Sequence, residues 1–162
     1  MISAPRLLRG ALGGWKTTGI WSWRSGVPIN VTSGQDRSFS GVGLDRADLT
    51  GSPYLPSGRS RGDQISAWFN TAAFTLNAPG TFGNSPRNLL RGPGFVNLDW
   101  SISKHFTLRE GLSVEVRGDF FNTFNNPHLN APGSSFSSAS TFGRITSAGD
   151  PRIIQTSMRI RF

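Results

Sequence analysis

The sequence has no cysteine, which excludes a disulfide framework and a thiolate metal site. It has no run of about 18 apolar residues, so no transmembrane helix is expected. Histidine is scarce: His105 falls in a stretch of strand periodicity and His128 in a loop, and neither belongs to a nucleophile or metal-ligand motif. We therefore expect no catalytic residue, no metal site and no cofactor, and we predict that the chain is not an enzyme.

Helix-forming runs and a targeting segment are missing as well. Long runs of alanine, glutamate and leucine do not occur, so few long helices are expected. The first residues, Met1-Ile2-Ser3-Ala4-Pro5-Arg6, lack the apolar core of a signal peptide. If the chain is a membrane protein, its export signal is missing, and we expect a fragment of a longer protein or an internal start at Met1. Apolar residues make up 36% of the chain, which suits strands with one polar face.

Basic residues are in excess, and the chain carries a net charge of +8 from 17 basic and 9 acidic residues. Such a balance can indicate a nucleic-acid-binding protein. However, the basic residues are scattered, and many alternate with apolar residues inside stretches of strand periodicity. We therefore predict a basic lumen or loop surface and no nucleic-acid partner.

The last residues of the chain, 152–162, alternate between apolar and polar side chains. Ile154, Met158, Ile160 and Phe162 fall on one face, and the intervening polar and basic residues fall on the other. A period of two predicts a strand with one apolar side. The stretch is also about as long as a tilted strand that crosses a bilayer, roughly 9–11 residues. It favours the closing strand of an outer-membrane β-barrel, and the alternative is an edge strand of a soluble sheet.

An earlier stretch, 15–31, shows the same alternation and carries three tryptophans on one face. Trp15 and Trp23 are far enough apart along a strand to lie near the two rims of a lipid-facing band, where aromatic girdles occur. The alternative is a tryptophan-rich core strand. We predict that Trp15, Trp23, Phe106 and Phe162 form the aromatic girdle.

Two more alternating stretches, 95–106 and 111–124, predict a hairpin with a tight turn. On the second stretch, Glu115, Arg117 and Asp119 share a face, an arrangement that is costly in a soluble core but ordinary beside a wet lumen. Lys104 interrupts the apolar face of the first stretch near its end, where its long side chain can reach lipid headgroups.

The connections between these strands alternate between long and short. Residues 32–94 and 125–151 are long and rich in glycine, proline and serine, whereas the other turns are short. We predict an all-β chain of about four antiparallel, up-and-down strands from the C-terminal end of a large transmembrane β-barrel in the outer membrane. The two long connections would be extracellular loops, and residues 1–14 a periplasmic turn. The alternative is a soluble β-sandwich that binds carbohydrate or acts in adhesion, which would require more strands at regular spacing.

A series of short segments is similar, in order, to segments of one family. They are Gly13-Gly14-Trp15, Ser25-Gly26-Val27-Pro28, Trp68-Phe69-Asn70-Thr71-Ala72-Ala73-Phe74, Gly80-Thr81-Phe82-Gly83-Asn84, Arg91-Gly92-Pro93-Gly94, Phe120-Phe121-Asn122-Thr123-Phe124-Asn125-Asn126-Pro127 and the terminal Phe162. With them the chain resembles the C-terminal part of a TonB-dependent receptor of the Oar-like group, which carries a carboxypeptidase-regulatory-like domain. The resemblance implies a plugged barrel of about 22 strands and energised uptake of a large solute by the full-length protein.

The same resemblance implies the partners. The final strand is similar to the signal read by the barrel-assembly machinery, which assigns that role to Ile154, Met158, Ile160 and Phe162. Outer-membrane lipid is the second expected partner. The plug and the TonB box are missing from this sequence, so contact with TonB is expected only through the missing N-terminal region.

Overall fold

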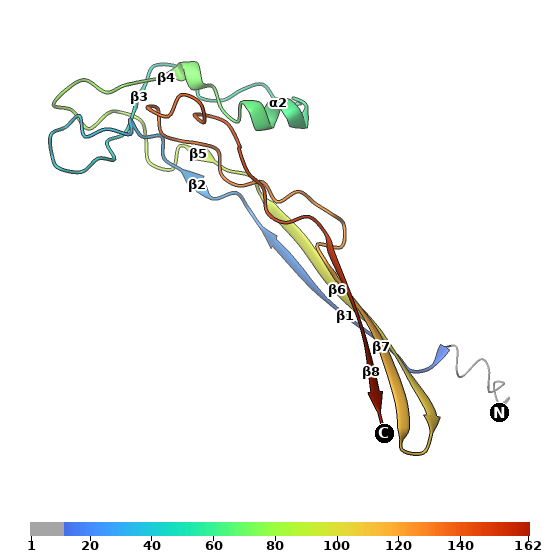
Figure 1. Cartoon of the computed structure of the whole chain (residues 1–162). Helices are drawn as coiled ribbons and strands as arrows, with labels where there is room; N and C mark the ends of the chain where they lie inside the picture. Colours follow the sequence, from blue (N-terminus) through green and yellow to red (C-terminus); the bar gives the residue numbers. More distant parts are fainter. Residues whose placement is uncertain (1–11) are drawn as a thin grey trace. The chain divides into compact units, whose positions relative to one another are not determined.

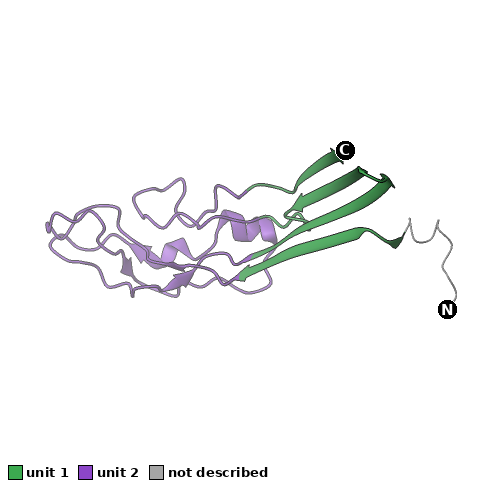
Figure 2. Ribbon diagram, turned by 90° about the horizontal axis from the view of Figure 1, so that it is seen from below, with its two compact units in different colours: residues 1–23, 96–127, 150–162 green, residues 24–95, 128–149 purple. Residues whose placement is uncertain are grey.

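The computed structural model describes residues 12–162, so most of the expected turn at 1–14 lies outside the described residues. The chain divides into two compact units (Figure 2). Unit 1 consists of Met1–Trp23, Val96–Pro127 and Asp150–Phe162, and unit 2 of Arg24–Phe95 and His128–Gly149.

Unit 1 contains a four-stranded sheet of order β1-β6-β7-β8 (Figure 1). The strands are β1 (Trp15–Arg24), β6 (Phe95–Arg109), β7 (Leu112–Phe121) and β8 (Ile153–Arg161). All neighbours are antiparallel: β6 pairs with β7, β7 pairs with β8, and β1 runs against β6 with Gly14 beside His105 and Gly19 beside Asp99. The expected all-β class with about four antiparallel strands is confirmed.

The first strand is shorter than the expected 15–31, because it ends at Arg24. Gly26 lies so close to Gly92 that a Cβ atom would collide with the carbonyl oxygen of Gly92. Beyond it, the short strand β2 (Pro28–Ile29) leaves the large sheet and pairs with β5 (Leu90–Arg91). The alternation that extends to residue 31 in the sequence therefore spans two different sheets.

The hairpin strands also differ from their expected bounds. β6 continues past residue 106 to Arg109, and its pairing with β7 is irregular between Thr107 and Arg109. β7 ends at Phe121, not at residue 124, because Asn122 adopts a left-handed backbone with φ of 52°. The turn between the strands contains Gly111, which has φ of 76° and thus a conformation that glycine adopts without steric cost.

Unit 2 gives the two long connections an ordered structure that their lack of periodicity does not predict. It holds two small sheets, β2 with β5 and β3 (Asp48–Leu49) with β4 (Phe74–Thr75), together with the helix α2 (Arg61–Ser66) and the 3-10 helix η1 (Thr71–Ala73). Ser60 caps α2 by accepting a hydrogen bond from the Asp63 amide at 3.1 Å. Within residues 12–162, no helix has the length and apolar character needed to cross a membrane.

In residues 12–162, the hydrophobic core lies entirely in unit 2. Its buried members are Ile29, Val31, Ala47, Phe69, Ala73, Phe74, Leu90 and Phe142. The rings of Phe69, Phe74 and Phe142 meet edge to face, with centroids 5.3 to 6.1 Å apart, an arrangement favoured by their quadrupoles. Because Phe142 comes from the second long connection, the core joins the two connections into one body.

Candidate membrane-facing surface

The register of the large sheet places its apolar side chains in rows on one face. Trp100, Phe120 and Ile154 are neighbours across three strands, and Phe106, Val114 and Ile160 form a second row. We call this surface the apolar face. By alternation along the strands it comprises Trp15, Trp21, Trp23, Leu98, Trp100, Ile102, Lys104, Phe106, Val114, Val116, Phe120, Ile154, Met158, Ile160 and Phe162.

No protein layer covers the apolar face among residues 12–162. Trp21 is 60% exposed, Met158 67% and Ile160 52%. Every buried apolar side chain of the described residues belongs to unit 2, so the four strands have no core of their own. An uncovered apolar surface that extends over four strands marks an interaction with lipid or with another protein.

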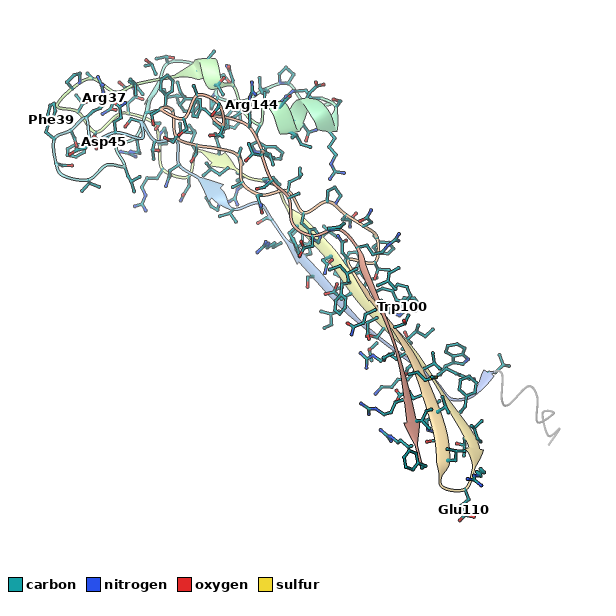
Figure 3. All side chains as sticks on the ribbon, in the orientation of Figure 1. Arg37, Phe39, Asp45, Trp100, Glu110 and Arg144 are labelled. Carbon is teal, nitrogen blue, oxygen red and sulfur yellow. The ribbon has the colours of Figure 1, made fainter. Side chains whose placement is uncertain are left out.

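The predicted girdle residues all lie on the apolar face, at its two ends. Figure 3 labels Glu110 in the hairpin turn. By register, Trp15, Phe106 and Phe162 lie toward this turn, and Trp23 lies toward the opposite end of the sheet. All four are exposed, with Trp23 at 72% and Phe106 at 42%. Aromatic residues at both ends of the face fit an interfacial girdle, which stays a prediction for these residues.

Lys104 is the one basic residue inside the apolar face, and the structure buries it. Its ammonium nitrogen lies 4.9 Å from the ring centre of Trp15 and 5.5 Å from that of Phe106, and it donates a hydrogen bond to the Gly13 carbonyl. Two aromatic rings and a carbonyl thus compensate the charge within the face. The alternation predicts that Lys104 lies on this face, but it does not predict the contacts with Trp15 and Gly13, because both are distant from Lys104 in the sequence.

The opposite face of the sheet is polar and charged. The Arg117 guanidinium binds the Asp119 carboxylate with both Nε and Nη2, at 2.7 to 3.0 Å, and Ser101 donates to the same carboxylate. Register places Glu115 opposite Arg159 on β8. His105 is exposed on this face, which is therefore suited to contact with water.

The asparagine-rich segment after β7 joins three strands at one end of the sheet. The Asn122 amide nitrogen donates to Asp99 on β6 at 2.9 Å, and its side chain exchanges 2.9 Å hydrogen bonds with the backbone of Asn126. The Asn125 side chain accepts a 3.0 Å hydrogen bond from the Arg152 amide just before β8. The segment thus links β6, the end of β7 and the start of β8 through hydrogen bonds.

The four predicted assembly-signal residues lie along the edge strand of the sheet. Ile154, Met158 and Ile160 belong to β8, and Phe162 follows its last residue. In the part of the chain that the structure describes, β8 pairs only with β7, and β1 only with β6. The outer edges of both strands therefore offer unpaired backbone groups to further strands.

In unit 2, a loop is organised around the buried Asp45 (Figure 3). Its carboxylate accepts hydrogen bonds from the amides of Arg37 and Ser38, at 2.7 and 2.6 Å, and from the Ser38 hydroxyl at 2.9 Å. Burial alone would raise the pKa of Asp45, but the hydrogen bonds from Ser38 and Arg37 outweigh it and hold the pKa below its ordinary value. His128 lies elsewhere in unit 2, with its ring 4.2 Å from that of Phe95.

A sheet with one apolar face, one polar face and no core of its own has the construction of a membrane β-barrel wall. The family model described as outer membrane beta barrel domain matches residues 1–155, and the chain belongs to this family. The expected location in the outer membrane is confirmed, and the soluble β-sandwich is not favoured. No curated protein and no solved structure matches the chain.

Proposed function

We propose that the chain supplies C-terminal strands of a TonB-dependent receptor of the Oar-like group, which takes up a large solute with energy from TonB. The uncovered apolar face of the four-stranded sheet is the observation that supports this proposal most strongly. Both long connections, 25–94 and 122–152, also start and finish at the same end of the sheet, opposite the short turn at 110–111. Long loops on one side and short turns on the other are typical of outer-membrane barrels.

Four strands are too few to enclose a lumen, since the smallest outer-membrane barrels have about eight strands. Unpaired backbone groups are not tolerated in hydrocarbon, so the edges of β1 and β8 must pair with strands outside the described residues. A receptor barrel of about 22 strands would provide them.

The proposed partners follow from the two faces and the edge. Lipid covers the apolar face, and the barrel-assembly machinery recognises β8 through Ile154, Met158, Ile160 and Phe162. TonB acts through a region N-terminal to this chain. We propose neither catalysis nor nucleic-acid binding, because the charged residues of the sheet form a lumen surface.

Adjacent positions on β8 offer a matched test of which face meets lipid. Met158 lies on the apolar face, Ser157 lies on the polar face, and both are exposed. A water-soluble maleimide should label Ser157→Cys and spare Met158→Cys when the complete gene product is in the outer membrane. A lipid-soluble maleimide should label both. Equal labelling of both variants by the water-soluble reagent would contradict a lipid-facing apolar face.

The uptake step needs a separate experiment. Depletion of solutes from the growth medium can be compared among wild-type cells, cells that lack this gene and cells that lack TonB. We expect a solute that only the wild-type cells remove. If both mutants deplete every solute at the wild-type rate, the receptor proposal is wrong.

A further inference from the structure

Unit 2 contains a cavity of about 500 Å³, which is within the usual size range of small-molecule sites. The segment Pro53-Tyr54-Leu55-Pro56 forms one wall, and the chain from Asn88 to Arg91 forms another. Arg59, Gln64 and Trp68 also line the cavity, from α2 and its flanks. The cavity lies wholly within unit 2, and Phe69 and Leu90 of its lining belong to the hydrophobic core, so the core holds its walls.

Two aromatic side chains of the cavity are held in place by their polar atoms. The Tyr54 hydroxyl donates to the Leu89 carbonyl at 3.3 Å, and the Trp68 indole N–H donates to the Arg91 carbonyl at 2.8 Å. Tyr54 nevertheless remains 65% exposed. An exposed ring that is already fixed can stack against a ligand with little loss of conformational freedom.

The charge of the lining is of one sign. Among the described residues, Arg59 and Arg91 line the cavity and no acidic residue does. Arg59 donates through Nη2 to the carbonyls of Asp63 and Ala67, and Arg91 through Nη1 to the Gly26 carbonyl. A guanidinium has five N–H donors, so each arginine retains donors for a ligand. The cavity is therefore complementary to an anion, and arginine binds carboxylates well.

Side-chain amides complete the polar groups. Gln64 is fixed by a 2.9 Å hydrogen bond from Nε2 to the Arg59 carbonyl, which leaves its amide oxygen as an acceptor. Asn88 also lines the cavity and is exposed, and its backbone N–H, not its side-chain amide, donates to Oδ1 of Asn30 at 2.6 Å. Planar amides both donate and accept, as the hydroxyl groups of a sugar do.

We propose that this cavity binds an acidic saccharide, with a sugar ring against Tyr54 and Trp68, hydroxyl groups on Gln64 and Asn88, and a carboxylate on Arg59 and Arg91. The apolar C–H face of a pyranose fits a flat aromatic ring, and its carboxylate fits the arginines. The inference deepens the proposed function, on which it rests, by naming the class of solute.

The test is an isothermal titration calorimetry experiment in which trigalacturonic acid is titrated into the detergent-purified chain. We expect saturable binding that weakens as salt is raised, and no binding of neutral galactotriose. Arg91→Gln and Tyr54→Ala should each weaken binding about tenfold or more, the loss expected for a charge-assisted hydrogen bond or a stacked ring. Arg87→Gln, an exposed arginine of unit 2 outside the cavity, should bind as the unaltered chain does.

Three results would overturn the inference: no binding of trigalacturonic acid, equal binding of the neutral trisaccharide, or tighter binding of triglutamate, which would assign the cavity to acidic peptides. Circular dichroism of each variant separates loss of the site from loss of the fold. Binding without TonB-dependent uptake would remove the receptor proposal and leave the saccharide site. TonB-dependent uptake without binding of trigalacturonic acid would remove the saccharide site and leave the receptor proposal.

Discussion

Asn122 and Asn125 show how single residues end a strand in this protein. Both have φ of 52°, in the left-handed region that asparagine enters more readily than most residues. Their side chains then bind the backbone of Asn126 and Arg152. Backbone conformation and hydrogen bonding therefore both select asparagine at these positions.

Replacement of Asn122 separates the two contributions. Asn122→Gly keeps the left-handed backbone and loses the side-chain hydrogen bonds, which should lower the free energy of unfolding by about 1–2 kcal/mol. Asn122→Ala loses the same bonds and adds backbone strain, so we expect a further loss of about 1 kcal/mol. Urea unfolding in detergent micelles measures both. Equal stabilities of the two variants would show that the left-handed backbone costs alanine nothing.

Asp45 should make its loop sensitive to acid. Its pKa is lowered in the folded chain, so its ionised form stabilises the fold above the ordinary carboxyl pKa of about 3.9. This stabilisation is lost as the pH falls through the lowered pKa. We expect the exchange protection of the Arg37 and Ser38 amides to fall below about pH 4, after correction for intrinsic rates.

Asp45→Asn provides the control for that pH dependence. An asparagine of similar shape cannot ionise, so the protection of the two amides should be low at every pH and should not fall further in acid. Hydrogen-exchange mass spectrometry of residues 37–45 measures both chains. Protection in the unaltered chain that stays constant from pH 6 to about pH 3 would contradict this role of Asp45.

Among the elements, the long strands could be predicted from sequence because their side chains follow a local pattern. Successive side chains on β7 and β8 fall alternately on the apolar and the polar face of the sheet, so the period of two appears in the sequence. The face of the sheet on which Trp100, Val114 and Ile160 lie could therefore be assigned from the sequence alone. The residue at which β1 ends could not be predicted from the sequence, because it depends on Gly92, which is distant in the chain.

The fold of unit 2 could not be predicted for the opposite reason, since its strands are two residues long and its contacts join distant segments. The Thr32 amide donates to the Ser134 carbonyl at 2.9 Å, and Phe69 packs against Phe142. Neither contact leaves a periodic signal. The cavity could not be predicted either, although Tyr54 and Trp68 are aromatic residues in a proline- and glycine-rich stretch and were a usable sign.

The two faces of β8 should respond differently to a new charge. Met158→Glu places a carboxylate on the apolar face and should cost about 1–2 kcal/mol, because charged substitutions on the lipid side of a barrel strand are destabilising. Ser157→Glu places it on the polar side opposite Arg117, where the cost should be close to zero. The two variants can be compared by their folding yield in lipid vesicles, which is measured as the fraction of protein whose gel mobility changes on heating. A lower yield for Ser157→Glu would reverse the assignment of the faces.

At the scale of the whole molecule, the sheet has two edges that a barrel must not have. β1 and β8 each pair with one neighbour in the described part of the chain, so a row of N–H and C=O groups on either side has no strand partner there. In water these groups bind solvent, but in hydrocarbon each costs several kcal/mol. Insertion of the sheet alone is therefore unfavourable even though its apolar face favours lipid.

The isolated chain should consequently form no pore. We expect no discrete conductance steps when detergent-purified residues 1–162 are added to a planar bilayer, under conditions in which a porin prepared in the same way gives regular steps. Edge-to-edge association is the competing outcome, since β1 and β8 can pair with other copies. Such assemblies would lack a fixed strand number and would give irregular leakage that rises with protein concentration. Uniform steps at low concentration would instead mean that the edges of this sheet are closed in a way that the order β1-β6-β7-β8 does not contain.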